Sequence, residues 1–205
     1  MSAHGSPAAL RPRETGHRER LITAMADSIE QRGYRDTTVA DVVRIARTSR
    51  RSFYEHFADR DSCFLALFDS ANEEMMARVA TAVDSDRPPG EQVDRAVDAY
   101  IDTLAERPAL YRSFVRELPG LGHAGAERGQ ATLERFAELL VALVDSGRRA
   151  QPELGLAPLE MDTAIIVVGG LRELLVTALA RGRDTGELRR SAGAAIKAIL
   201  GVGRR

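Results

Sequence analysis

The sequence predicts an all-α fold of about nine helices, in which three N-terminal helices precede a larger helical bundle. Apolar residues recur at helical spacing, i, i+3, i+4 and i+7, in most windows between turn signals. No β-branched alternating run is bounded by the turn residues of a hairpin, so strands are not expected. The expected helices cover residues 17–32, 39–46, 50–57, 60–83, 92–106, 108–118, a seventh ending near 144, 160–182 and 186–202.

Composition is that of an ordinary soluble protein. With 205 residues, 44% of them hydrophobic and 29% charged, the chain can bury one large core or two smaller ones. No apolar run approaches the roughly 20 residues that span a bilayer, and the first residues lack the apolar core of a signal peptide. We therefore expect a cytoplasmic protein with no membrane association. The single cysteine, Cys63, excludes an internal disulfide.

A change of pattern separates an N-terminal arm from the first helix. Residues 1–16 are rich in Gly, Ser, Pro and Ala without periodicity, so we expect a disordered arm. Leu21, Met25 and Ile29 then repeat every four residues, which predicts a helix, and Gly33 is a natural stop.

The next three helices each begin at a capping residue. Thr38, followed by Asp41 at the third helical position, has the spacing of a capping box. Ser49 is a favourable N-cap for the third helix, and Asp59 for the long fourth helix. The short second and third helices are therefore joined by a turn of three residues.

Proline, glycine and acidic residues divide the rest of the chain. The stretch 84–91 separates the fourth and fifth helices, and Pro108 forces a boundary before the sixth. A Gly-rich loop at 119–125 precedes the seventh helix, and 146–158 is a long loop before the last two.

The second and third helices have the organisation of a helix-turn-helix. Phe53 and Phe57 are four residues apart and share one face of the third helix, which their size makes the core face. Arg50, Arg51 and Tyr54 then fall on the opposite face. They lie near the N-terminal end of the helix, which is the part that contacts base edges when a recognition helix enters the major groove. Charged residues usually coat a solvated helix face, but this group follows a capped helix and a tight turn, which favours DNA binding.

Polar side chains around this helix are the candidate contacts to double-stranded DNA. Arginine reaches guanine edges or phosphates, and hydroxyls and helix starts suit phosphate oxygens. The first 62 residues carry 11 arginines against 9 acidic residues, a net +2, so the positive charge must gather on one face. The candidates are Thr38, Arg47, Ser49, Arg50, Arg51, Ser52, Tyr54, His56 and Arg60.

Residues 33–68 resemble the DNA-binding domain of the tetracycline-repressor (TetR) family. The matching landmarks are Gly33-Tyr34, Thr37-Thr38-Val39, Asp41, Ser49, Phe53-Tyr54, His56-Phe57 and the basic Arg60. Two positions depart from the family pattern: Arg47 replaces the usual glycine of the turn, and Val43 replaces a small alanine. A left-handed conformation at Arg47 costs about 1 kcal/mol or more. The resemblance implies a DNA-binding domain at 17–62 and a ligand-binding, dimerising domain at 63–205.

The second domain supplies candidates for a small-molecule cavity and for a dimer interface. A helical bundle commonly holds its ligand between helices, although each of these residues suits a plain core equally well. The cavity candidates are Met75, Tyr100, Leu104, Tyr111, Phe114 and Arg172. The last two helices are apolar on more than one side, which favours a four-helix dimer interface. The interface candidates are Ile165, Val168, Gly169, Leu171, Leu175, Ala195 and Ile199.

These patterns predict a transcriptional repressor that binds a palindromic operator as a homodimer and is released by a small-molecule effector. The alternative is a helical ligand-binding or interaction protein that no longer binds DNA, and activation instead of repression depends on the position of the operator. No enzyme is expected, because the four histidines lack metal-ligand spacing and the chain has no phosphate loop or nucleophile elbow. We expect no cofactor and no metal.

Overall fold

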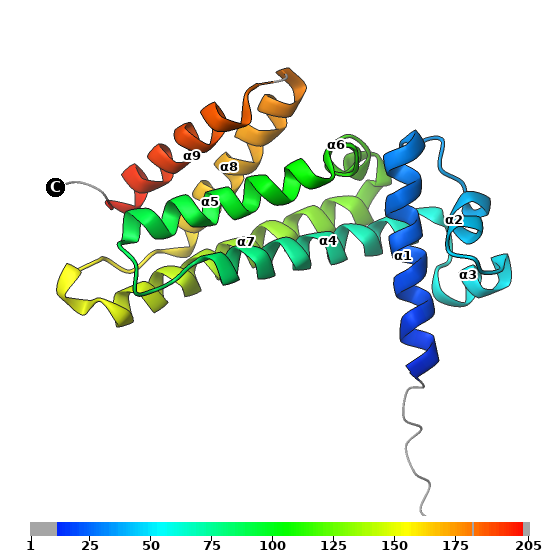
Figure 1. Cartoon of the computed structure of the whole chain (residues 1–205), viewed down its shortest axis with the longest axis horizontal. Coiled ribbons are helices and arrows are strands. Elements are labelled where there is room, and N and C mark those ends of the chain that lie inside the picture. Colours follow the sequence, from blue (N-terminus) through cyan, green and yellow to red (C-terminus); the bar gives the residue numbers. More distant parts are fainter. Residues whose placement is uncertain (1–11, 182, 203–205) are drawn as a thin grey trace, which may run out of the picture. The chain divides into compact units, whose positions relative to one another are not determined.

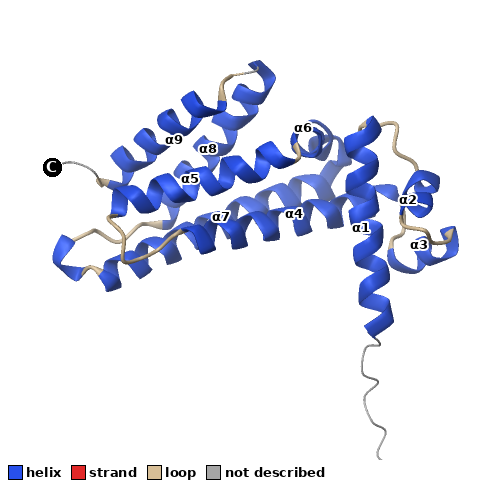
Figure 2. Ribbon diagram, viewed as in Figure 1, coloured by secondary structure: helices blue, strands red, loops and turns tan. Residues whose placement is uncertain are grey.

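The structure of this chain is a computed structural model that describes residues 12–181 and 183–202 (Figures 1 and 2). These residues form helices and loops and contain no strand, which confirms the predicted all-α class. None of their helices combines the length and apolarity needed to cross a bilayer. The helices are α1 (Pro12–Arg32), α2 (Val39–Ile45), α3 (Arg50–His56), α4 (Arg60–Ala82), α5 (Pro89–Glu106), α6 (Pro108–Glu117), the 3-10 turn η1 (Leu118–Leu121), α7 (Gly122–Ala150), the 3-10 turn η2 (Pro152–Leu154), α8 (Met161–Arg181) and α9 (Thr185–Leu200).

The chain divides into two compact units, and the division falls inside α4, between Leu67 and Phe68. The first unit holds α1, α2, α3 and the start of α4. The second holds the rest of α4 and all later helices. The functional boundary expected between residues 62 and 63 lies about one helical turn earlier and stays a prediction.

The core of the first unit consists of the apolar residues that the helical periodicity predicts to be buried. Leu21, Met25 and Ile29 of α1 are fully buried, and so are Phe53 of α3 and Phe64 of α4. α1 begins at Pro12, before the expected start near residue 17, because proline is well tolerated in the first turn of a helix. Residues 1–11 of the expected arm lie outside the described residues.

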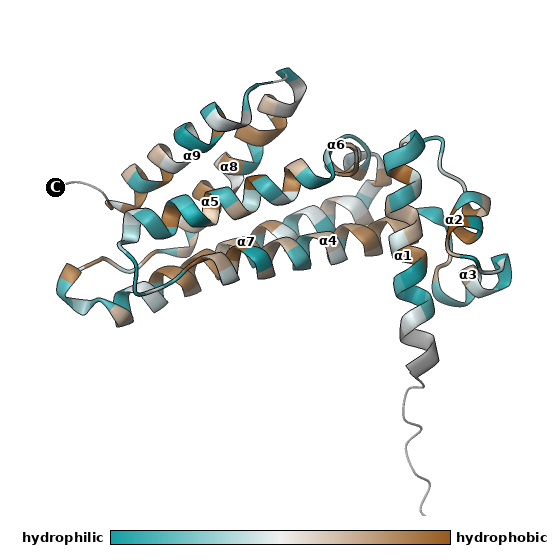
Figure 3. Ribbon diagram, viewed as in Figure 1, coloured by the Kyte–Doolittle hydropathy of each residue, from teal (hydrophilic) through white to brown (hydrophobic). Residues whose placement is uncertain are grey.

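In the second unit, helices that are distant in sequence pack along their apolar faces. Teal and brown alternate along α5 and α7 in Figure 3, as in helices with one buried face. Lys197 of α9 pairs with Asp94 of α5 at 2.7 Å, and Arg189 reaches Asp98 at 3.0 Å and Asp102 at 2.5 Å. α5 and α9 are therefore held together by a row of ion pairs on their solvent side as well as by their core.

α7 is longer than the sequence predicts. It ends at Ala150, whereas the apolar pattern indicates an end near residue 144. The sequence predicts that Gly147 lies in the loop 146–158, but it is buried inside the helix against the side-chain amide of Gln92. This packing compensates for the weak helix propensity of glycine, and the sequence pattern does not reveal it.

The start of α7 depends on a glycine. Gly125 is buried beneath the 3-10 turn η1, and a Cβ at this position would overlap the carbonyl oxygen of Leu118. Only glycine therefore allows the turn and the helix to approach each other this closely.

Candidate nucleic-acid interface

The start of α2 is fixed by a complete capping box, as the sequence predicts. The Thr38 hydroxyl accepts a hydrogen bond from the Asp41 N–H at 3.2 Å, and the Asp41 carboxylate accepts one from the Thr38 N–H at 3.1 Å. The Thr38 hydroxyl also donates to that carboxylate, and this bond lowers the pKa of Asp41. Arg32 pairs with the same carboxylate at 2.9 Å.

The turn between α2 and α3 is a Schellman motif with arginine in the place usually taken by glycine. The Thr48 N–H donates to Val43 O at 2.9 Å, and the Arg47 N–H donates to Arg44 O at 3.3 Å. Arg47 has φ = 50°, the left-handed region, and is the only non-glycine residue of the described chain there. The turn therefore keeps its usual hydrogen bonds, and Arg47 carries the strain expected from the sequence.

The third helix is anchored on one side, as predicted. Phe53 is fully buried and Phe57, just after the helix, is 5% exposed. Their rings lie 5.6 Å apart. Ser49 caps the helix by accepting a hydrogen bond from the Ser52 N–H at 3.1 Å, and its own O–H remains available to a phosphate oxygen.

The opposite side of α3 is open to solvent. Tyr54 is 57% exposed, and Arg50 is also exposed. Arg51 extends into solvent with 90% of its side chain exposed and pairs with Glu55, one turn later, at 3.2 Å. An exposed pair of this kind contributes little stability, so Arg51 can leave Glu55 for a stronger acceptor.

Arg60 is held differently from the other candidates. Its guanidinium lies 4.2 Å from the centre of the Tyr34 ring, donates to Thr37 O at 3.2 Å, and pairs with Asp61 at 3.3 Å. Burial and the hydrogen bond to Asp61 raise the pKa of Tyr34. Arg60 therefore fixes the segment between α1 and α2, a role for which sequence reasoning gave no signal.

The nine candidate contacts thus separate into two groups of four and Arg60, which stands apart. Arg47, Arg50, Arg51 and Tyr54 are exposed, and the Tyr54 ring meets buried Phe53 edge to face. Ser49, Ser52, Thr38 and His56 lie at or between the ends of α2 and α3, where the two hydroxyls of the caps serve the helices themselves. Arg60 alone is committed to several partners within the unit.

Comparison with known proteins decides the family. The sequence profile described as "Bacterial regulatory proteins, tetR family" matches residues 21–67, the span of the three helices and the anchored start of α4. An HTH-type transcriptional regulator of Haemophilus influenzae, itself uncharacterized, is 20% identical over 161 residues, which are 77% of each chain. Residues 21–67 therefore form a DNA-binding domain of the TetR-family type.

Solved structures of TetR-family regulators share the fold along nearly the whole chain. One from Pectobacterium atrosepticum is 22% identical, with a TM-score of 0.71 over 94% of this chain and 96% of its own. FadR of Bacillus subtilis, in complex with stearoyl-CoA, is 15% identical, with a TM-score of 0.69 over 89% of this chain and 97% of its own. At these identities the likeness shows the fold.

The second unit contains a cavity of about 100 Å³, which we call the tyrosine cavity. All six residues that the sequence proposed for a ligand site line it: Met75, Tyr100, Leu104, Tyr111, Phe114 and Arg172. They come from α4, α5, α6 and α8, so helices far apart in sequence bring them together.

The polar groups of the tyrosine cavity lack partners in the described part of the chain. No hydrogen bond joins the hydroxyls of Tyr100 and Tyr111 to these residues, and no carboxylate among them pairs with Arg172, whose side chain is exposed to solvent. Burial raises the pKa of Tyr100 to about 12, and the charge of Arg172 opposes that rise. Burial also raises the pKa of Tyr111, and Tyr100 contributes to that shift because the two phenols are close.

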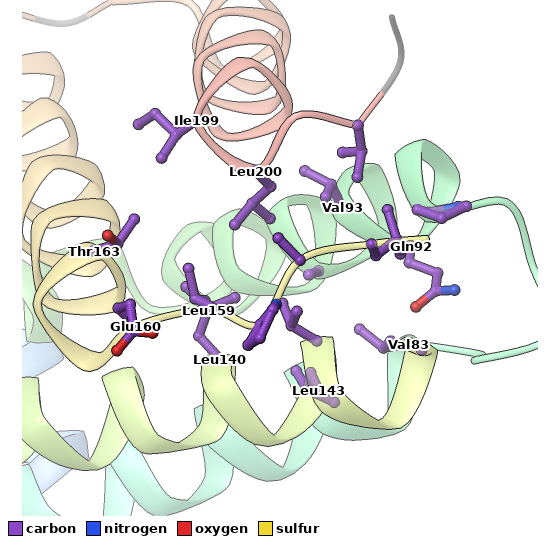
Figure 4. A pocket seen from close by; sticks show the side chains of 18 residues that line it. Val83, Gln92, Val93, Leu140, Leu143, Leu159, Glu160, Thr163, Ile199 and Leu200 are labelled. Atoms are coloured by element: carbon purple, nitrogen blue, oxygen red, sulfur yellow. The ribbon is translucent and has the colours of Figure 1, made fainter. Parts of the chain in front are cut away.

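Sequence reasoning missed a larger cavity of about 250 Å³, which we call the end cavity (Figure 4). Figure 4 shows Leu143 of α7, Leu200 of α9 and Val93 of α5 around it, with Leu159 and Glu160 from the segment before α8. Only the fold reveals this cavity, because its walls come from helix ends and a loop.

The predicted dimer residues on α8 do not share one face. Leu175 is 5% exposed and Leu171 packs on the same core cluster, so both belong to the interior of the chain. We correct these two assignments, since the pattern could not distinguish the two apolar sides of α8. Gly169 faces Leu133 of α7 at 4.0 Å, whereas Gly170 is open.

The outer apolar face of the last two helices consists of other residues. Ile166 of α8 is 66% exposed and Ile199 of α9 is 49% exposed. Ala195, one helical turn before Ile199, is also exposed. Ile165 is partly buried, and Val168, also partly buried, lines the tyrosine cavity inside the unit. No cluster of three metal-ligating side chains occurs among the residues that the structure describes.

Proposed function

We propose that this regulator binds a palindromic operator as a homodimer, represses transcription there and releases the DNA when a small molecule occupies its second unit. The outward face of α3 carries the DNA-binding part of this proposal. Arg50, Arg51 and Tyr54 are exposed on a helix whose other side is fixed by buried Phe53 and Phe57. A rigid helix with donors near its N-terminal end fits the major groove.

In this proposal, some side chains contact the base edges of the DNA and others contact its phosphate backbone. Arg50 and Arg51 donate to guanine edges or to phosphates, and Tyr54 offers its hydroxyl and ring edge. The free O–H of Ser49 and the basic side chain of Arg47 lie at the turn, where phosphate oxygens pass. Thr38, Ser52 and His56 flank this centre, and Arg60 holds the supporting loop.

The outer face of α8 and α9 is the proposed dimer interface. Ile166, Gly170, Ala195 and Ile199 are exposed there and are apolar or small, which suits close packing of helices. A two-fold dimer places two recognition helices about one turn of DNA, roughly 34 Å, apart and therefore reads a palindrome.

Ile166→Glu is expected to convert the dimer to a monomer in sedimentation velocity, with unchanged helix content.

Release of DNA requires a ligand whose affinity differs between two conformations. α4 runs from Arg60 in the first unit to Ala82 in the second, so a ligand that prefers another tilt of α4 changes the separation of the recognition helices. The tyrosine cavity touches α4 at Phe68, Asn72 and Met75. The similar fold of FadR in complex with stearoyl-CoA supports a ligand site in this unit.

The test is operator binding. Duplexes selected from a random pool by the full chain supply the operator, and a gel shift at fixed salt concentration measures the dissociation constant. Arg51→Ala and Tyr54→Ala are each expected to weaken binding by about five- to 150-fold. Arg95→Ala, which removes an exposed arginine of α5, is the control and leaves binding unchanged.

Two results separate the alternatives. If both α3 variants bind the selected duplex as tightly as the wild type, the docking assignment is wrong. If no duplex is enriched at all, the chain is a helical ligand-binding or interaction protein. A reporter gene placed behind the selected operator distinguishes repression from activation.

A further inference from the structure

The tyrosine cavity and the end cavity are connected by a third apolar space. This middle cavity has a volume of about 90 Å³. It shares the side chains of Tyr100, Phe136 and Val168 with the tyrosine cavity. It shares Ala96 and Leu140, among others, with the end cavity. The three spaces are therefore neighbours, separated only by these shared side chains.

The three cavities follow one another along two helices. On α5, Leu104 lines only the tyrosine cavity, Val97 only the middle one and Gln92 only the end cavity. On α7 the order runs the opposite way, from Thr132 to Gly147, as expected for antiparallel helices. Val93 and Leu104 are separated by about 16 Å at the rise of an α-helix, so the joined space is long and narrow.

Donor groups are concentrated at one end of this space. The guanidinium of Arg172 and the hydroxyls of Tyr100 and Tyr111 face the tyrosine cavity without partners in the described residues. Arg172 is exposed, and no fully buried side-chain nitrogen or oxygen of the described residues lacks a partner, so these donors are open to water. An anionic oxygen group that replaces this water can accept hydrogen bonds from all three donors, one of them charged.

The carboxylates nearest to Tyr111 do not oppose an anion there. Glu106 and Glu74 both influence Tyr111, but Arg78 pairs with Glu106 at 2.7 Å and with Glu74 at 2.8 Å. Their charges are therefore engaged by a cation outside the cavity lining.

The middle and end cavities have the opposite character. Valine, leucine and alanine side chains form most of their walls, and the amide of Gln92 already donates to Arg87 O at 2.7 Å. Glu160 is the one charged residue among those that line the end cavity, and its carboxylate repels an anion there (Figure 4). The space therefore accepts a molecule that is anionic at one end and aliphatic along its length.

We propose that the three cavities together bind one long, unbranched aliphatic carboxylic acid, with its carboxylate at Arg172, Tyr100 and Tyr111 and its chain reaching the end cavity. This inference deepens the proposed function, since it names the chemical class of the effector. A compact ligand fills only the tyrosine cavity, whose volume is below the roughly 150 Å³ of an engineered cavity that holds benzene.

The first measurement is a chain-length series. The full chain is titrated calorimetrically with hexanoate, decanoate and hexadecanoate below their aggregation limits, in the absence of DNA. Affinity is expected to rise about fourfold with each added methylene, as burial of an aliphatic chain predicts. Decanol and the coenzyme A thioester of decanoate test the head group, and both are expected to bind more weakly than decanoate.

Two variants locate the ends of the ligand. Arg172→Gln is expected to weaken decanoate binding by about ten- to a hundredfold and to leave decanol unchanged, whereas exposed Arg95→Gln affects neither. Ala96→Leu narrows the passage between the middle and end cavities, so it weakens hexadecanoate but not hexanoate. Ala105→Leu, exposed on the same helix, is its control.

Several results would overturn the inference. Absence of carboxylate binding by a folded chain refutes it, and equal binding of decanoate and decanol refutes the head-group assignment. Affinity that stops rising at hexanoate, or a response to Ala96→Leu at every length, refutes the long channel. Because these titrations contain no DNA, failure of operator binding is a separate result and bears only on the proposed function.

Discussion

The two units of this regulator are stabilised over very different distances in the sequence. In the first unit, helix ends are closed by residues three or four positions away, such as Thr38 with Asp41 and Ser49 with Ser52. In the second unit, Arg189 and Asp102 are 87 residues apart and Lys197 and Asp94 are 103 apart. Local chemistry therefore determines the outward face of α3, and long-range packing determines the cavities.

This difference has a functional consequence. A recognition helix must present the same side chains in the same place, and caps with a buried aromatic anchor give it one conformation. A ligand site must instead combine residues from several helices, so its shape changes when any of them moves. The following substitutions test this contrast, beginning with the largest expected effect.

Phe53→Ala removes the anchor of α3 and is expected to lower the free energy of unfolding by about 3–5 kcal/mol, because Phe53 is fully buried. Urea denaturation followed by circular dichroism measures this change. Tyr54→Ala, at the exposed neighbouring position, is expected to change it by less than about 0.5 kcal/mol. Equal losses for the two variants would contradict the anchored-helix description.

Gly125→Ala tests the close approach of α7 and η1 in the second unit. The added Cβ overlaps the carbonyl oxygen of Leu118, so the turn η1 must shift, with an expected loss of about 1–3 kcal/mol. Gly120→Ala is the matched control, since no atom lies within 4 Å of its Cβ position. If the two variants melt at the same temperature, Gly125 is not required for the approach.

Thr38→Ala removes the cap of α2 and is expected to cost about 1 kcal/mol at neutral pH. The cap hydrogen bonds lower the pKa of Asp41, so its carboxylate stabilises the folded state above its ordinary pKa of about 3.9. This contribution is lost as the pH falls through the lowered folded pKa. The difference between wild type and variant in urea titrations should therefore shrink in acid, and a constant difference would exclude this linkage.

Arg47→Gly relieves the left-handed conformation of the turn and is expected to stabilise the protein by up to about 1 kcal/mol. Arg44→Gly is the contrast, because Arg44 lies within α2, where glycine is expected to destabilise by about 1 kcal/mol. Differential scanning calorimetry measures both. Destabilisation by both variants would show that the Arg47 side chain has a stabilising role that outweighs the strain.

Sequence reasoning succeeded where one residue constrains its near neighbours. The caps at Thr38 and Ser49 and the burial of Phe53 and Phe57 are all confirmed. It failed where a distant partner changes the local preference, as at Gly147, which stays helical against Gln92. The six residues proposed for a cavity do line one, although their spacing alone suited a plain core equally well.

The sequence by itself determined the helices, their caps and the exposed face of α3, because these depend on hydrogen bonds and periodicity within a few turns. The tertiary structure alone decided which side of α8 faces the core, where Leu175 is buried, and which helices enclose the three cavities. The sequence of a helix with two apolar sides does not indicate which side packs against the rest of the chain. Only the packing of α5, α7 and α9 around it makes one side interior and leaves Ile166 in solvent.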